Sequence, residues 1–278
     1  MTDQLSDYES DAFSQTGEDG VINRILNTIP VHDKWCVEFG AWDGIHLSNA
    51  RRLIIEAGYS SVLIEGDKKK FVDLVENYRS NDQVFPINGF VGFESDDNLD
   101  TLLATTPIPT DFDFLSIDID GNDYHVWDAV KMYKPKVVCI EFNPTIPKHI
   151  DFEQPADPAC HKGASLTALT RLAKSKGYEL VHVLPWNAIY VSAEYFNAFE
   201  IADNRVEVMQ SDQSYVTWIW SGYDGEVAVS GYQKLLWHDT KIRAEKIQPL
   251  PRFLREYVVR YGLVKKVLFR LLKAVGAI

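Results

Sequence analysis

Residues 34–49 read KWCVEFGAWDGIHLSN, and this stretch decides the fold class. It opens with Trp35-Cys36-Val37, an apolar run that is too short for a helix and is typical of a buried strand. A carboxylate, Glu38, comes next, followed by a glycine-containing turn and then a helical pattern. A strand that ends in a carboxylate, turns through glycines and enters a helix predicts the first unit of a nucleotide-binding α/β domain.

The spacing of the turn indicates which cofactor the domain binds. A dinucleotide site favours G-x-G-x-x-G, which leaves room for a pyrophosphate at the helix N-terminus. This turn instead reads E-x-G-x-x-x-G, with carboxylates at Glu38 and Asp43 and glycines at Gly40 and Gly44. Two carboxylates repel a pyrophosphate but suit an ammonium group and ribose hydroxyls. The pattern therefore favours S-adenosylmethionine over a nicotinamide cofactor, and an ordinary tight turn after a core strand is the alternative.

Composition restricts the class of protein further. The chain has 278 residues, 46% of them hydrophobic, which is enough for a sizeable core and argues against disorder. We expect a reducing, cytoplasmic setting, because three cysteines make no disulfide framework. We expect neither a secretion signal in the acidic first residues nor a stretch long and apolar enough to span a membrane.

The net charge of −12 is unevenly distributed. Residues 241–278 contain ten Lys or Arg and two Asp or Glu, so they carry +8 and the rest of the chain carries −20. An acidic body with a basic tail is a poor general binder of nucleic acid, and we expect no nucleic-acid partner.

Further predicted strands also end in polar or acidic residues. They cover 61–64, 84–90, 113–119 and 136–142, and the last is an unbroken apolar run typical of a parallel strand with both faces covered. The residues at their ends are Glu65, Gly66, Asn88, Asp118, Asp120, Asp123 and Glu141. In open parallel sheets the ligand crevice lies beyond the carboxyl ends of the strands. We therefore expect Asp118 and Asp120 in the site, and Asp123 as the cap of a helix over 124–132.

A long irregular segment follows the fifth strand. Residues 145–163 contain several prolines, and loops of this length in compact domains are often lids. We expect the segment to cover the crevice and to bring His149 or His161 there as a base. After a helix over 165–176, residues 178–184 and 187–191 alternate as a hairpin, so the predicted fold has five parallel strands plus an antiparallel hairpin.

The remainder divides into an aromatic and a basic part. Tryptophans recur among polar residues of 206–237 and suit an edge cover, a substrate platform or a dimer contact. Residues 252–275 are amphipathic with a basic face. That face suits docking on an anionic membrane surface, and packing on the acidic body or on a second subunit is the equal alternative.

Four motifs in order carry a family resemblance: VEFGAWDG, LIEGD, LSIDIDGND and VVCIEFNP. With the entry segment SQTGEDG and the late NAIYVSAEYF, they resemble the FkbM-like branch of class I S-adenosylmethionine-dependent methyltransferases over residues 14–196. The resemblance implies a Rossmann-like fold with helices on both sheet faces, and methyl transfer to a hydroxyl of a sugar or natural product.

The resemblance also implies roles for individual residues. Glu65 would hold the ribose, and Asp118 would lie near the sulfonium. Related sugar O-methyltransferases hold magnesium with strand-end aspartates, which here implies Mg²⁺ at Asp118, Asp120 and Glu141. The full set of expected cofactor-binding residues is Gln15, Glu38, Gly40, Asp43, Gly44, Asn49, Glu65, Gly66, Asn88 and Asp118.

Together these expectations describe an O-methyltransferase acting on a sugar hydroxyl of a glycan, glycolipid, lipid-linked acceptor or nucleotide-sugar. Asp120 is the expected base or metal ligand, with His149 and His161 as alternative bases. A nicotinamide-dependent sugar dehydrogenase and a non-catalytic, membrane-docked scaffold are the rival classes, and a homodimer is left open. The expected organisation is a lead over 1–12, a methyltransferase domain over 13–200, a Trp-rich extension over 201–240 and a basic amphipathic region over 241–278.

Overall fold

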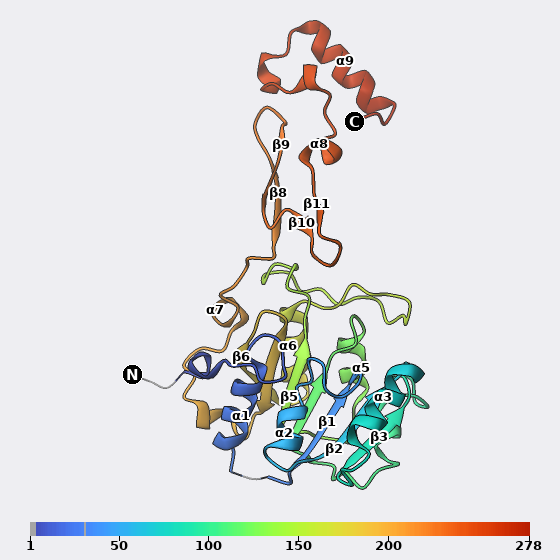
Figure 1. Cartoon of the computed structure of the whole chain (residues 1–278). Coiled ribbons are helices and arrows are strands. Elements are labelled where there is room, and N and C mark those ends of the chain that lie inside the picture. Colours follow the sequence, from blue (N-terminus) through green and yellow to red (C-terminus); the bar gives the residue numbers. More distant parts are fainter. Residues whose placement is uncertain (1–3, 31) are drawn as a thin grey trace. The chain divides into compact units, whose positions relative to one another are not determined.

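A computed structural model describes residues 4–30 and 32–278, and Figure 1 shows its elements. The chain divides into two compact units, the first running to Asp212 and the second covering Gln213–Ile278.

The first unit is built on a seven-stranded sheet in the order β3-β2-β1-β4-β5-β7-β6. β1 to β5 are parallel to their neighbours, whereas β7 runs antiparallel to both β5 and β6. This is the class I methyltransferase-like fold, and the prediction of five parallel strands closed by an antiparallel hairpin is confirmed. The strands are β1 Trp35–Phe39, β2 Ser60–Glu65, β3 Val84–Asn88, β4 Phe114–Ile117, β5 Val137–Glu141, β6 Tyr178–Val183 and β7 Asn187–Ser192.

Helices cover both faces of this sheet. Alternate residues of β1 show the arrangement, because Cys36 belongs to the core cluster that includes residues of α1, α2 and α3, whereas Val37 belongs to the cluster that includes residues of α4, α5 and α6. Successive strand side chains point to opposite faces, so the unbroken apolar strands supply two cores at once. The helices are α1 Glu18–Thr28, α2 Arg51–Ile55, α3 Lys68–Tyr78, α4 Leu99–Leu103, α5 Asp123–Ala129, α6 Leu166–Ser175 and α7 Val206–Met209, with short 3-10 turns η1 Leu5–Tyr8 and η2 Phe196–Phe199.

The strand register brings the predicted site residues to one edge. Phe39, the last residue of β1, is paired with Ile64 of β2 and Ile117 of β4. The residues that follow these three therefore meet at the carboxyl edge of the sheet. Those residues are Gly40, Glu65 and Asp118.

The short helix α4 was not expected from the sequence. α4 begins after Asn98, whose side chain accepts the Thr101 backbone N–H at 2.9 Å, and buries Leu99 and Leu103. A five-residue helix shows too little periodicity to be recognised in a sequence, because one turn samples only two core positions.

The second unit begins with small antiparallel pairs. These are β8 Thr217–Ser221 with β9 Val227–Gly231, and β10 Lys234–Leu235 with β11 Thr240–Lys241. Short helical turns follow before the last helix: η3 Leu236–His238, α8 Ala244–Ile247, η4 Arg252–Leu254 and η5 Val258–Arg260.

The expected C-terminal amphipathic helix is present as α9, Leu263–Ala274. Residues 252–262, which share its apolar periodicity, form the separate turns η4 and η5 instead of extending the helix. Gly262 supplies the extended backbone that begins α9, and glycine is a poor helix-interior residue, so the helix starts there. Within the residues described, no helix has the length and apolar character needed to cross a membrane.

Candidate functional site

The turn after β1 is closed by contacts between parts of the chain. Gly40 has φ +72°, and a Cβ there would lie 2.1 Å from the Asp118 carbonyl oxygen. Gly44 has φ +70°, and its Cβ would lie 2.6 Å from the Tyr78 ring. Both predicted glycines are therefore required by close approach of the chain to itself, in addition to the left-handed backbone.

Glu38 holds this turn from inside the fold. Its carboxylate accepts the Ser48 hydroxyl at 2.5 Å and the Asn49 backbone N–H at 2.7 Å. The Asn49 side chain in turn donates to the Ser116 hydroxyl of β4 at 3.0 Å. Burial raises the pKa of Glu38 to about 7 in spite of these hydrogen bonds. Both carboxylate oxygens already accept a hydrogen bond, so Glu38 and Asn49 join β1, the turn and β4 into one rigid wall of the site.

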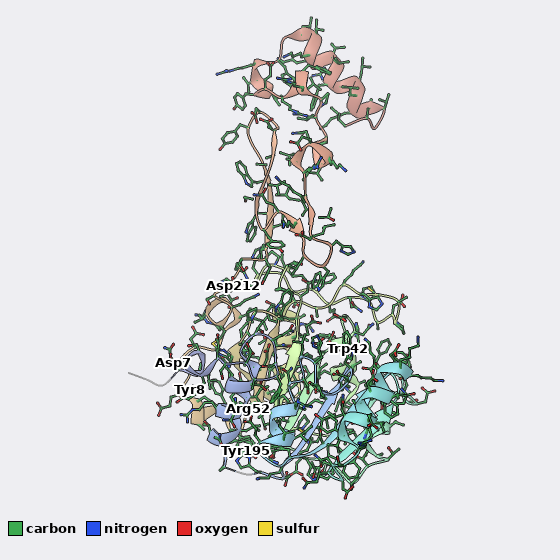
Figure 2. The ribbon with its side chains drawn as sticks, viewed as in Figure 1. Asp7, Tyr8, Trp42, Arg52, Tyr195 and Asp212 are labelled. Carbon is green, nitrogen blue, oxygen red and sulfur yellow. The ribbon has the colours of Figure 1, made fainter. Side chains whose placement is uncertain are left out.

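Glu65 connects the second strand to the same turn. Its two oxygens accept the backbone N–H groups of Trp42 at 2.8 Å and Asp67 at 2.6 Å. Trp42, labelled in Figure 2, is about half exposed, and the Lys70 ammonium lies 3.6 Å from its ring centroid. Each Glu65 oxygen keeps a second lone pair, which is what a ribose diol would use.

The remaining predicted residues of this region fix the path of the backbone. Asp43 accepts the N–H groups of Ile45 and His46 at 2.9 and 2.8 Å, and these bonds hold its pKa below the usual value. The Asn88 side chain donates to the Glu65 carbonyl at 2.8 Å. A Cβ on Gly66 would lie 2.4 Å from the Phe90 ring, so this glycine lets an exposed aromatic ring lie over the end of β2.

Three predicted carboxylates lie together at the ends of β4 and β5. Asp118, Asp120 and Glu141 each offer an oxygen, and these atoms all lie within 4.8 Å of one another. In the described part of the chain, no hydrogen bond or ion pair reaches any of the three carboxylates. Like charges this close are unfavourable unless protons or a cation compensate them.

The electrostatics of the cluster follow from burial and mutual repulsion. Burial, followed by the charges of Asp123 and Asp120, raises the pKa of Asp118 to about 8. Burial and then the charge of Asp118 raise the pKa of Glu141 well above its usual value. The cluster therefore either holds protons near neutral pH or takes up a positive charge.

Asp123 fixes the backbone turn that carries Asp120 of the cluster. Its buried carboxylate accepts the N–H groups of Ile119 and Gly121, both at 2.9 Å, which fixes the turn that carries Asp120. Asp120 itself has φ +57°, a left-handed conformation. The expectation that Asp123 caps the next helix is wrong, because Asn122 occupies the N-cap position and Asp123 bonds backward into the turn. That helix, α5, ends at Ala129.

The irregular segment after β5 packs against this turn through Gln154. Its buried side chain donates to the Asn122 side chain at 2.8 Å and to the Cys160 carbonyl at 2.7 Å, and accepts from Lys162 and Gly163. The expected long loop is thus pinned to the β4–α5 turn.

The two histidines of this segment differ in their surroundings. His161 Nδ1 lies 3.2 Å from the Asp120 carbonyl oxygen, so the structure brings His161 to the cluster. His149 is exposed elsewhere on the segment. Of the two candidate bases, His161 contacts the acidic turn through its Nδ1.

Sequence reasoning did not single out a further buried acid, Glu18, in the first turn of α1. It accepts the Thr16 backbone N–H at 2.7 Å and the Asn187 side-chain amide at 3.0 Å, and Gln15 contributes its backbone N–H at 3.2 Å. Asn187 begins β7 opposite Glu141, and its Oδ1 is buried without a hydrogen-bond partner. Glu18 and Asn187 lie 169 positions apart, and no local pattern predicts such a pair.

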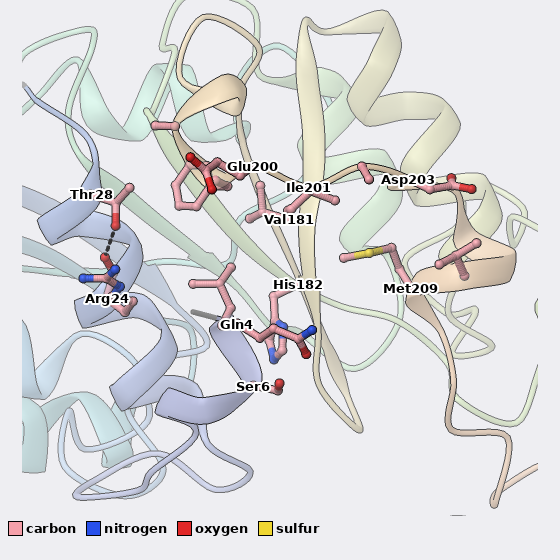
Figure 3. A pocket seen from close by; sticks show the side chains of 15 residues that line it. Gln4, Ser6, Arg24, Thr28, Val181, His182, Glu200, Ile201, Asp203 and Met209 are labelled. Carbon is pink, nitrogen blue, oxygen red and sulfur yellow. Dashed lines mark hydrogen bonds between the residues drawn. The ribbon is translucent and has the colours of Figure 1, made fainter. Parts of the chain in front are cut away.

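A separate cavity of about 820 Å³ lies between η1, α1, β6 and residues 198–209 (Figure 3). Figure 3 shows Arg24, His182 and Met209 among its walls. Of the described residues, those that line it include none of the predicted site residues, so it is distinct from the acidic edge.

Comparisons with known proteins found similar solved structures only. No protein-family model matches the chain, and no curated protein matches it. Among solved structures, the N-terminal domain of EvdMO1 in the presence of SAH and D-fucose aligns at 12% identity and TM-score 0.43, covering 63% of this chain and 82% of that one.

Two further matches are a SAM-dependent methyltransferase from Aquifex aeolicus and TrmK of M. capricolum in complex with SAH. The first aligns at 10% identity and TM-score 0.40, covering 67% of this chain and 95% of that one. The second aligns at 12% and 0.39, covering 62% and 67%. These matches concern the fold of about two thirds of the chain and nothing beyond it.

The raised pKa of Asp118 has a consequence for stability. A carboxyl whose pKa is raised on folding stabilises the fold while it is protonated, and this contribution is lost as pH rises from about 4 through about 8. Without added ligand, we expect the melting temperature to fall over this range. Asp118→Asn should raise it by about 2–6 °C at pH 8.5, with little change at pH 4.

Calorimetric melting of both proteins across this pH range would measure the effect. Asp128→Asn, at an exposed acid of α5, is the matched control and should follow the wild type. If the melting temperatures of the wild type and of Asp118→Asn changed with pH in parallel, protonation of Asp118 would not contribute to stability.

Proposed function

We propose that this chain is an S-adenosylmethionine-dependent O-methyltransferase of the FkbM-like branch, acting on a hydroxyl of a sugar-containing acceptor. The observation that carries the proposal is the group formed by Asp118, Asp120 and Glu141, three carboxylates without a cationic partner in the described chain. They lie beyond the ends of β4 and β5, where ligands of such sheets bind. A cationic donor suits this edge.

The nature of the edge also discriminates between cofactors. Glu38 and Glu65 are buried at the ends of β1 and β2, where a dinucleotide fold would bring a pyrophosphate. Carboxylates disfavour that group, whereas the free lone pairs of Glu65 suit ribose hydroxyls. This argues against the nicotinamide-dependent alternative.

The three carboxylates also fit a divalent cation. Hard cations prefer oxygen ligands, and each of the three carboxylates offers an oxygen within 4.8 Å of the other two. Asp118, Asp120 and Glu141 would hold the ion, which would lower the pKa of a bound hydroxyl and orient it.

The chain's own part in the reaction is alignment and proton removal. When bound, S-adenosylmethionine supplies a methyl group already activated by its sulfonium. Asp120 is the exposed member of the cluster and is the proposed base or metal ligand, since an acceptor can reach it. His161 is the reserve base beside it. His149, on the same segment, is the other proposed alternative.

The experiment that tests the proposal offers the purified protein S-adenosylmethionine with a panel of sugars, nucleotide-sugars and glycolipids, and follows acceptor mass. A gain of one CH₂ unit, reduced more than about tenfold by EDTA and restored by Mg²⁺, is the expected result. Calorimetry with S-adenosylmethionine and NAD in parallel provides the binding control. Binding of NAD alone, or the absence of both binding and turnover, contradicts the proposal. Turnover that EDTA does not reduce contradicts only the role of a metal ion.

A further inference from the structure

The surface of α9 carries an apolar ridge that the second unit leaves uncovered. Val264, Val267, Leu271 and Val275 recur every three or four residues, so they share one face. Between 50% and 79% of each of these side chains is exposed. On the other side of the helix, Phe269 packs against the ring of Tyr261 at 5.8 Å, which anchors α9 to its own unit.

A basic stripe runs along the next face of the helix, from Arg270 beside the ridge to Lys273, whose ammonium lies 5.2 Å from the Phe269 ring centroid. Lys266, Arg270 and Lys273 recur at spacings of four and three and are all exposed. The preceding turn η5 adds the exposed apolar residues Val258 and Val259. Across residues 241–278 the charge is +8, with acids only at Glu245 and Glu256, and Glu256 is already paired with Lys265 at 2.9 Å.

We infer that α9 and η5 form a docking surface for an anionic lipid membrane. An apolar ridge beside a basic stripe is what an interfacial helix presents, with its apolar side chains among the acyl chains and its cations at the headgroups. Twelve residues of helix span about 18 Å, so α9 would lie along the surface.

Two other occupants fit less well. A second copy docking face to face would bring two basic stripes together, and such like-charge contacts are unfavourable. The acidic first unit has the charge to attract the basic stripe, but its described residues offer no continuous apolar surface to cover the ridge. Its exposed large hydrophobics are scattered, and no described element of that unit contributes more than two of them.

The test is co-flotation of the full chain with vesicles. We expect binding to phosphatidylcholine vesicles containing about 30% phosphatidylglycerol and little binding to phosphatidylcholine alone, with loss in high salt. Each basic side chain near an anionic surface strengthens binding about fivefold, so the triple variant Lys266→Gln, Arg270→Gln, Lys273→Gln should bind about 100-fold more weakly.

A second variant tests the ridge: Val264→Ser, Val267→Ser, Leu271→Ser should weaken binding more than about tenfold. The matched control removes three exposed charges from the first unit, Arg79→Gln, Lys131→Gln and Lys174→Gln, and should float like the wild type. Circular dichroism checks that each variant is folded, and methyl transfer to a water-soluble acceptor should be unchanged throughout.

Several outcomes would overturn the inference. They are absence of flotation by the wild type, equal binding to neutral and anionic vesicles, and equal loss in the first-unit control. Light scattering that shows a dimer dissociated by the ridge variant, with no flotation of the wild type, would assign the face to a second copy instead.

Discussion

Asp120→Asn should lower the rate of methyl transfer by about 10²–10⁴-fold while S-adenosylmethionine still binds with an affinity within about threefold of the wild type. The reason is that the substitution keeps the shape of the residue and removes the charge that would take a proton or hold a metal ion. Asparagine also tolerates the left-handed conformation that Asp120 adopts, at φ +57°, so the turn should survive. Steady-state kinetics and calorimetry measure the two halves of this expectation.

The control for Asp120 is Asp128→Asn, the same chemical change at an exposed acid on α5 that pairs with Lys131. It should leave both rate and affinity as they are. Full activity in Asp120→Asn would remove this residue from the mechanism and would favour His161, which contacts the same turn.

Gly40→Ala should destabilise the first unit by about 3 kcal/mol or more, lowering the melting temperature by about 6–12 °C. Two costs add at this position. A non-glycine residue at φ +72° loses about 1–2 kcal/mol, and the new Cβ would also lie 2.1 Å from the Asp118 carbonyl oxygen. Because the clash is with backbone, β1 and β4 have to separate at the point where the cofactor edge begins, so cofactor affinity should fall as well.

Gly58→Ala separates the two costs. Gly58 has nearly the same backbone angle, φ +69°, and a Cβ there would meet nothing within 4 Å. It should therefore lose only the conformational part, about 1–2 kcal/mol. Differential scanning calorimetry of both variants gives the difference directly, and equal losses would mean that the approach of Gly40 to Asp118 is not tight.

The sheet was predictable because its signals are local. The runs before Glu38, Glu65, Asp118 and Glu141 are apolar and end in an acid, which marks both a buried strand and its carboxyl end. The family resemblance implied the grouping of Asp118, Asp120 and Glu141, and the structure brings oxygens of the three side chains within 4.8 Å of one another.

What could not be predicted depends on partners far away in the sequence. Glu18 is buried because it bonds Asn187 on β7, and Glu38 is saturated by Ser48 and Asn49 instead of presenting free oxygens. The role of Asp123 was mistaken because a helix-capping acid and a turn-supporting acid look alike in sequence. Only the paths of the neighbouring N–H groups distinguish them.

Gln154 fixes the irregular segment in place. Its amide nitrogen donates to Asn122 of the β4–α5 turn and to the Cys160 carbonyl, and its amide oxygen accepts from Lys162 and Gly163. One side chain therefore holds residues 160–163 against the turn. The exposed stretch Pro155–Ala159 lies between these bonds and is itself tied to the turn, because the Asp157 carbonyl accepts from the Asn122 side chain at 3.1 Å. Because these bonds use the Gln154 and Asn122 side chains and backbone groups, the exposed side chains of 155–159 can be exchanged while Asp118, Asp120 and Glu141 stay in register.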